Sequence, residues 1–211
     1  MQKSVYSLIL SDEVVAAVDR LAYSAGASRS AFVDQVLAEY VSCQTPEMRM
    51  REIFEQAERL LTAADGFQPM LQPSDYMMSL RSALSYKYNP TVRYSVELFR
   101  DGGGSRGELR VSLRSQSSGL ILCLGQFFRL WDRLERAYIG SMESAAQDGR
   151  YARTLRLPDV SQQRQGEIIA GYIRALDAAM KAFFARLDDP EGAAGACDRI
   201  YQDYLKHYPS I

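Results

Sequence analysis

Arginine is the residue type whose number and spacing in this chain could do chemistry. Residues 76–156 hold thirteen basic and seven acidic side chains, a net charge of +6, and Lys87 is the one basic residue among them that is not arginine. Guanidinium groups bind carboxylates and phosphates through paired hydrogen bonds. We expect one face of a small sheet to carry four of these groups: Arg93, Arg110, Arg114 and Arg156. Such a face could bind an anion, a nucleic-acid backbone or an acidic partner. The alternative is an ordinary solvated face, whose arginines pair with Glu97 and Glu108.

Other chemistry has little support in the residue types. His207 is the only histidine, and Cys43, Cys123 and Cys197 lack the spacing of metal ligands. We therefore predict no metal site and no cofactor. No nucleophile stands in a pattern with a base and an orienting third group, so we predict that the protein is not an enzyme. Residues 101–107 are rich in glycine but lack the lysine of a phosphate-binding loop, and they are predicted to form a hairpin tip.

The elements that must position the arginines follow from the hydrophobic pattern. Residues 92–98 and 109–113 alternate with period two, which predicts an antiparallel hairpin, and residues 151–157 predict a third strand. Apolar residues at helical spacing predict the helices, which we place at residues 47–64, 74–86, 119–144, 163–187 and 191–207.

The first 42 residues show a different order of elements. Residues 4–10 alternate, with Tyr6, Leu8 and Leu10 on one face. Ser11 is a good N-cap for a helix that Gly26 ends, and Ser28 is a good N-cap for a second helix. The pattern predicts a strand followed by two short helices. One strand and two short helices bury too little to be stable as a single copy, so we predict a dimer.

This order resembles the ribbon-helix-helix repressors of the Arc and MetJ type, over about 40 of the 211 residues. The resemblance implies a paired β-ribbon in the major groove of DNA. The side chains that it would present to the bases are Lys3, Val5, Ser7 and Ile9. It also implies a phosphate clamp at the start of the second helix, formed by Ser28, Arg29 and Ser30. Residues 1–45 carry a net charge of −2, which leaves open a fold kept only for dimerisation, in a protein-interaction module of the antitoxin or plasmid-maintenance type.

Together these patterns predict an α+β protein with three parts. Residues 1–45 form a dimeric ribbon-helix-helix domain, 46–73 a connecting helix and linker, and 74–211 a mostly helical domain with a small antiparallel sheet. The predicted function is a dimeric DNA-binding transcriptional regulator in the cytoplasm. Its partners are DNA and a second copy of the chain, with a protein partner or a small effector at the C-terminal domain. No apolar run is long enough to cross a membrane.

Overall fold

The structure is a computed structural model that describes residues 5–41, 43–64, 66–71, 74–99 and 105–211. The chain divides into two compact units, Met1–Thr45 and Pro46–Ile211. Among the described residues, the first unit contains two helices, and every strand lies in the second.

The first unit is a pair of short helices, α1 (Asp12–Ser24) and α2 (Arg29–Tyr40). Gly26 follows α1 with a φ of 63°, in the left-handed region that favours glycine, so the predicted end of this helix is confirmed. The Ser28 side chain caps α2 by accepting a hydrogen bond from the Ala31 N–H at 3.2 Å. Few apolar side chains are enclosed between the helices, because Ala22 and Ala38 are the only hydrophobic residues described as buried in this unit.

The predicted ribbon-helix-helix fold is wrong. Residues 5–10 are extended and exposed but form no strand, and helices precede the first described strand of the chain, which begins at Gln68. Their alternation satisfies the period of a strand, yet a strand also needs a neighbour for its N–H and C=O groups. None of these six residues makes a backbone hydrogen bond to another described segment. Alternation in the sequence therefore gave a false strand.

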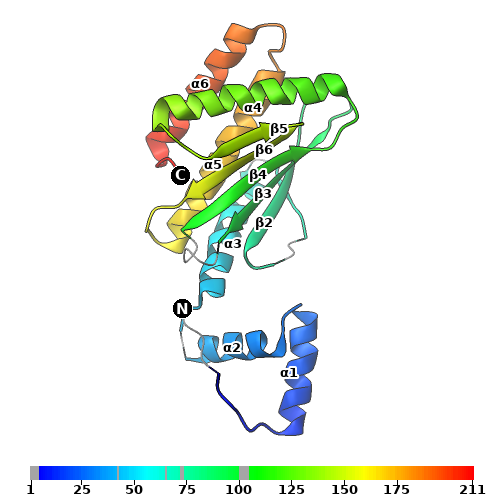
Figure 1. Ribbon diagram of the computed structural model, residues 1–211, viewed down its shortest axis with the longest axis vertical. Helices are drawn as coiled ribbons and strands as arrows, with labels where there is room; N and C mark the ends of the chain where they lie inside the picture. The colour runs from blue at the N-terminus through cyan, green and yellow to red at the C-terminus, as the bar shows by residue number, and fades with distance from the viewer. Residues whose placement is uncertain (1–4, 42, 65, 72–73, 100–104) are drawn as a thin grey trace. The chain divides into compact units, whose positions relative to one another are not determined.

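The second unit is built on a six-stranded antiparallel sheet in the order β1-β2-β3-β4-β6-β5 (Figure 1). The strands are β1 (Gln68–Pro69), β2 (Met77–Ala83), β3 (Thr91–Leu98), β4 (Arg106–Leu113), β5 (Ser144–Gln147) and β6 (Arg150–Arg156). β3 and β4 are the expected hairpin, and β6 pairs with β4 as the expected third strand. The glycine-rich tip that we predicted at residues 101–107 falls mostly on 100–104, which lie outside the described residues.

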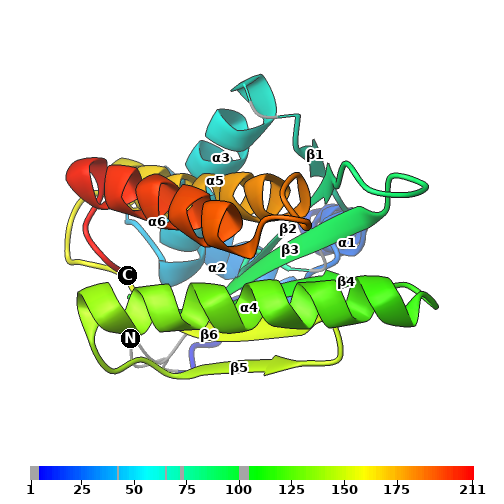
Figure 2. The same cartoon turned by 90° about the horizontal axis from the view of Figure 1, so that it is seen from above.

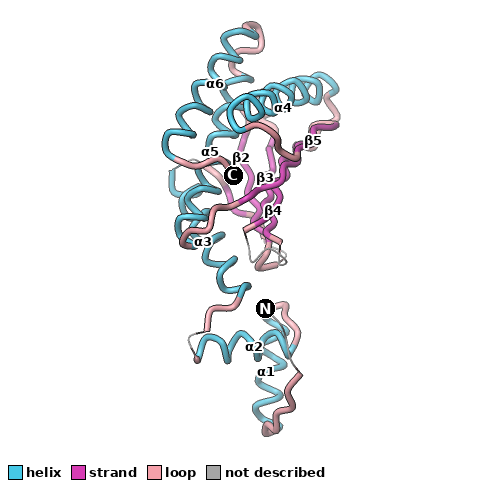
Figure 3. Tube along the Cα trace, turned by 60° about the vertical axis from the view of Figure 1, so that its left-hand side comes forward, coloured by secondary structure: helices cyan, strands magenta, loops and turns pink. Residues whose placement is uncertain are grey.

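Helices cover one face of this sheet, as Figures 2 and 3 show. They are α3 (Pro46–Ala64), α4 (Ser118–Ile139), α5 (Gln162–Phe184) and α6 (Pro190–His207). The inward residues of β3 are the predicted ones, and Val92, Tyr94, Val96 and Leu98 are all buried. α4 packs on the same face, where Phe128 stacks on Tyr151 of β6 with ring centroids 5.3 Å apart.

Two expectations for the second unit differ from the structure. α3 is part of the core: its Ile53 carbonyl lies so close to Gly166 of α5 that a Cβ there would be 2.6 Å away. Residues 74–86, predicted as a helix, contain strand β2 instead. The sequence of β2 alternates poorly, because the apolar Met77 lies on the open side and the polar Ser82 is buried on the helix side.

Candidate nucleic-acid interface

The face of the sheet opposite the helices is polar and rich in arginine. Strand periodicity puts alternate residues of β2, β3, β4 and β6 there, where they are exposed or half-buried, apart from the small residue Ser79. Its described arginines are Arg81, Arg93, Arg106, Arg110, Arg150 and Arg156. We call this surface the open face.

One line of directly paired residues crosses the open face from edge to edge. Each member lies opposite the next on the neighbouring strand, and the six are Gln68, Arg81, Arg93, Ser112, Arg150 and Gln147. We call this line the basic row. It holds three guanidinium groups, one hydroxyl and two amides, and no carboxylate. With neighbouring strands about 4.8 Å apart, its five steps span about 24 Å.

The arginines of the basic row pair with no described carboxylate. The Arg81 Nε donates to the Gln68 Oε1 at 2.9 Å, and the Arg93 Nη2 donates to the Ser79 hydroxyl at 3.3 Å. Arg81 and Arg93 are directly opposite each other. Like charges in that position repel, and a bound anion would relieve the repulsion.

A pair of carboxylates elsewhere on the open face, unlike the arginine pair, has a counter-charge within the sheet. Glu97 and Glu108 are also directly opposite each other, and Arg110 bridges them, at 2.6 Å to the Glu108 Oε2 and 3.3 Å to the Glu97 Oε2. The hydrogen bonds to Glu108 raise the pKa of Arg110, although burial opposes them. Arg110 therefore compensates part of the charge of the acidic pair, whereas the arginine pair in the basic row has no described counter-charge.

The four arginines predicted for this face are divided by the structure. Arg93 belongs to the basic row, and Arg110 is occupied by the two glutamates. Arg156 lies opposite Arg106 at the far end of β4 and β6, a second arginine pair with no described carboxylate partner. Arg114 is exposed one residue after β4 ends.

Two arginines of the basic row were not predicted from the sequence. Arg81 lies in the segment that was assigned to a helix, and Arg150 is the first residue of β6, directly after the turn at Asp148 and Gly149. The Asp-Gly pair is a strong hairpin signal and could have placed a strand on each side of it.

The base-reading residues predicted in the first unit do not form a strand. Val5, Ser7 and Ile9 lie in the extended segment, where Val5 and Ile9 are fully exposed, and Lys3 lies outside the described residues. Nothing in this segment holds the three side chains in the register that groove readout needs.

The predicted phosphate clamp is present as a helix start, but its cation is occupied. The Ser28 hydroxyl caps α2 and lies 3.5 Å from the Ser30 hydroxyl. Arg29 forms a bidentate pair with Asp19 of α1, with both N–O distances at 2.6 Å. Hydrogen bonds from Arg29 lower the pKa of Asp19, so the carboxylate stays charged and competes with any phosphate for the guanidinium.

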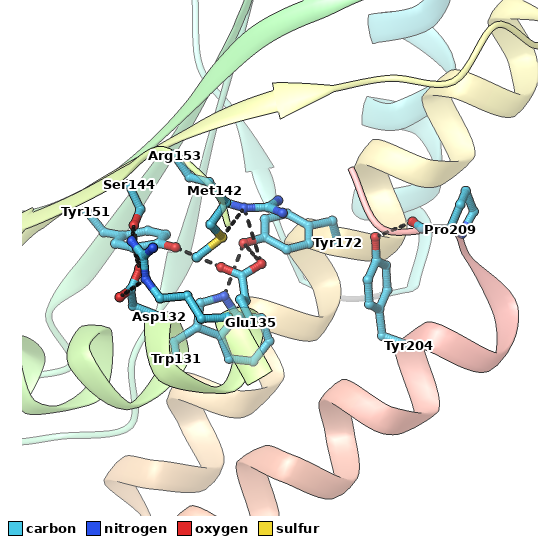
Figure 4. A network of polar contacts seen from close by, with 11 residues as sticks. Trp131, Asp132, Glu135, Met142, Ser144, Tyr151, Arg153, Tyr172, Tyr204 and Pro209 are labelled. Carbon is cyan, nitrogen blue, oxygen red and sulfur yellow. Dashed lines mark hydrogen bonds and ion pairs between the residues drawn. The ribbon is translucent and has the colours of Figure 1, made fainter. Parts of the chain in front are cut away.

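A second cluster of charge lies beneath the sheet, between α4, β6 and α5 (Figure 4). Glu135 of α4 is fully buried and accepts hydrogen bonds from the Tyr151 and Tyr172 hydroxyls at 2.8 and 2.9 Å. The Nε of Arg153 lies 3.3 Å from its Oε1. Burial raises the pKa of Glu135, against the opposing effects of Arg153 and the two hydroxyls. Burial also raises the pKa values of both tyrosines, so they stay neutral donors.

The described residues contain no group of three or more His, Cys, Asp or Glu side chains that could hold a metal ion. Burial raises the pKa of the Cys197 thiol to about 11, so this cysteine is protonated at neutral pH. No helix among the described residues has the length and apolar character to span a membrane.

Comparison with known proteins gives no relative. No protein-family model matches the chain, and neither curated proteins nor solved structures give a match. The function must therefore be argued from the residues.

Proposed function

We propose that this protein binds DNA through the basic row of its sheet, as a self-associating regulator. The observation that carries the proposal is the row itself: three arginines, a serine and two glutamines cross the sheet with no carboxylate among them. All of these side chains can donate hydrogen bonds to phosphate oxygens.

The length and setting of the row support a duplex as the ligand. A span of about 24 Å exceeds the roughly 12 Å width of the major groove, so the row can reach phosphates on both sides of it. Two positions beside Arg93 are small, Ser79 and Ser95, so a duplex backbone can approach closely there. Contacts of this kind supply affinity and orientation rather than sequence choice.

The test is a fluorescence anisotropy titration of a labelled 30-base-pair duplex at several salt concentrations. The variant Arg81→Gln/Arg93→Gln/Arg150→Gln removes the charges of the row. We expect affinity at low salt to fall at least about tenfold, and the slope of log K against log salt to fall by about three, one for each lost phosphate contact.

A matched control removes three other exposed arginines that pair with no described carboxylate. Arg129→Gln/Arg133→Gln/Arg199→Gln changes the net charge equally on α4 and α6, and we expect it to keep most of the affinity. Equal losses in the two triple variants would refute an interface at the sheet, as would the absence of duplex binding by the wild type at low salt.

Self-association through Met1–Thr45 rests on a separate observation. Of the large hydrophobic side chains that are exposed in the described part of the chain, twelve of eighteen lie in this unit. An apolar surface is complementary to itself, and two copies could bury it in one two-fold interface. Both helices carry such exposed side chains, for example Leu21 of α1 and Leu37 of α2.

Sedimentation velocity over a range of concentrations tests this second part. We expect the wild type to be dimeric at micromolar concentration and the variant Val36→Asn/Leu37→Asn to sediment as a single chain. Leu122→Asn, an exposed leucine of α4 in the other unit, is the control and should leave the dimer intact. A wild type that sediments as one chain throughout would exclude self-association.

A further inference from the structure

A hollow of about 250 Å³ lies beside the last residues of β6, at the edge of the sheet. Its walls come from the loop between α4 and β5, the end of β6, and the residues that follow α6. The Tyr204 hydroxyl donates to the Pro209 carbonyl at 3.0 Å and holds the chain at this place (Figure 4). The hollow is thus a defined feature of the second unit.

One of the residues that line the hollow is Arg153, a buried arginine with an N–H group that makes no hydrogen bond. Only 1% of the Arg153 side chain is exposed. The Arg153 Nε lies 3.3 Å from both the Met142 sulfur and the Glu135 Oε1, and the group lies over the Tyr172 ring at 4.6 Å. Its Nη1 is buried without a hydrogen-bond partner. A buried N–H without a partner is destabilising, and Arg153 is thus a donor that a small anion beside it could satisfy.

A second guanidinium lies on the exposed side of the same hollow. Arg156 lines it, is exposed, and has no described carboxylate partner. The residue directly opposite Arg156 on β4 is another arginine, Arg106. Hydroxyls of Ser141, Thr154 and Ser210 complete the polar wall.

One lining side chain is a carboxylate and opposes this charge, and Ile211, the last residue of the sequence, lines the hollow beside it. Glu143 also lines the hollow and accepts a hydrogen bond from the Thr154 hydroxyl at 3.2 Å. Glu135 contacts Arg153 but does not line the hollow. The lining side chains therefore carry two positive charges and one negative charge.

We propose that this hollow binds a small anion, a metabolite that carries a carboxylate or a phosphate group. Arg153 receives the anion at the buried end and Arg156 at the exposed end, since guanidinium groups match both anions geometrically. The volume lies below the roughly 300–1,000 Å³ of sites for drug-sized ligands, so the metabolite is small. This is an effector site apart from the basic row, and it stands whether or not the protein binds DNA.

The test is isothermal titration calorimetry of the full chain at constant ionic strength, without DNA. Inorganic phosphate is the probe in one set of titrations and succinate in the other. We expect at least one of them to bind one per chain, with a Kd of about 1 mM or tighter. The probe with the lower Kd shows whether the site prefers a phosphate or a carboxylate group.

Two variants locate the binding. Arg156→Gln should weaken it at least about tenfold, the loss expected for one charge-assisted hydrogen bond. Arg106→Gln removes the opposite member of the same arginine pair, which does not line the hollow, and should change the Kd less than about twofold. Both substitutions are on the exposed face of the sheet, so neither should unfold the protein.

The proposal is overturned if neither probe binds more tightly than about 10 mM at matched ionic strength. Equal losses in Arg156→Gln and Arg106→Gln would overturn it too, because they would show anions on the exposed arginine pair rather than in the hollow.

Discussion

The two units of this chain differ most in what they do with apolar side chains. Pro46–Ile211 buries large residues from every layer, including Trp131, Phe127 and Tyr201, in one continuous core. Among the described residues of Met1–Thr45, the buried hydrophobic residues are two alanines. Burial of apolar surface is the dominant favourable term in folding. The second unit therefore has its own source of stability, whereas the first leaves most of its large apolar side chains exposed.

The largest expected effect tests the interior of the second unit. Glu135→Gln keeps the shape of the side chain but leaves the buried Arg153 guanidinium without a counter-charge. Breaking one side of a buried ion pair typically costs about 3–5 kcal/mol, and we expect a loss of that order in urea unfolding. Glu97→Gln at the exposed pair with Arg110 is the control and should cost less than about 1 kcal/mol. Similar losses for the two variants would mean that water reaches the pair of Glu135 and Arg153, so that it is not a buried ion pair.

The next prediction compares the two units directly. Leu124 is fully buried in α4, and Leu124→Ala should lower the free energy of unfolding of the second unit by about 2–5 kcal/mol. Leu21 of α1 is 54% exposed, and Leu21→Ala should change stability by less than about 0.5 kcal/mol in dilute solution. Chemical unfolding at two protein concentrations measures both.

Raising the protein concentration separates the effects of Leu21→Ala and Leu124→Ala further. If Leu21 is buried between two copies, the cost of Leu21→Ala grows as the protein associates, while that of Leu124→Ala does not. A large cost for Leu21→Ala in dilute solution would contradict the view that the first unit lacks a core of its own.

Sequence patterns predicted best where one strand face is buried and the other is not. The hairpin of β3 and β4 was found from Val92, Tyr94 and their neighbours, because each buried residue alternates with a polar one. β2 was missed because Met77 is apolar on the open side and Ser82 is polar on the buried side, which breaks the alternation. Without β2 and the start of β6, the sequence could not show that Arg81, Arg93 and Arg150 form one row.

The first unit shows the opposite failure. Its caps and its glycine were found correctly because they depend on nearby residues, as with Ser28 and Ala31. The alternation of residues 5–10 also looked local, but strand formation depends on a neighbouring segment, and no described segment supplies one. The phosphate clamp was predicted from the resemblance to ribbon-helix-helix repressors, which could not reveal that Asp19 already occupies Arg29.

The glutamates of the open face lie apart from the basic row, so charge changes sign along the strands. Glu97, Glu108 and Glu143 line up across neighbouring strands, four residues from the basic row along β4. At about 3.3 Å per residue, the two lines are about 13 Å apart. A polyanion that ran parallel to the strands would cross from arginines onto glutamates, whereas one that ran perpendicular to them would stay on the basic row, which holds three arginines and no carboxylate. For the duplex that we propose as the ligand, the glutamates therefore disfavour an axis parallel to the strands.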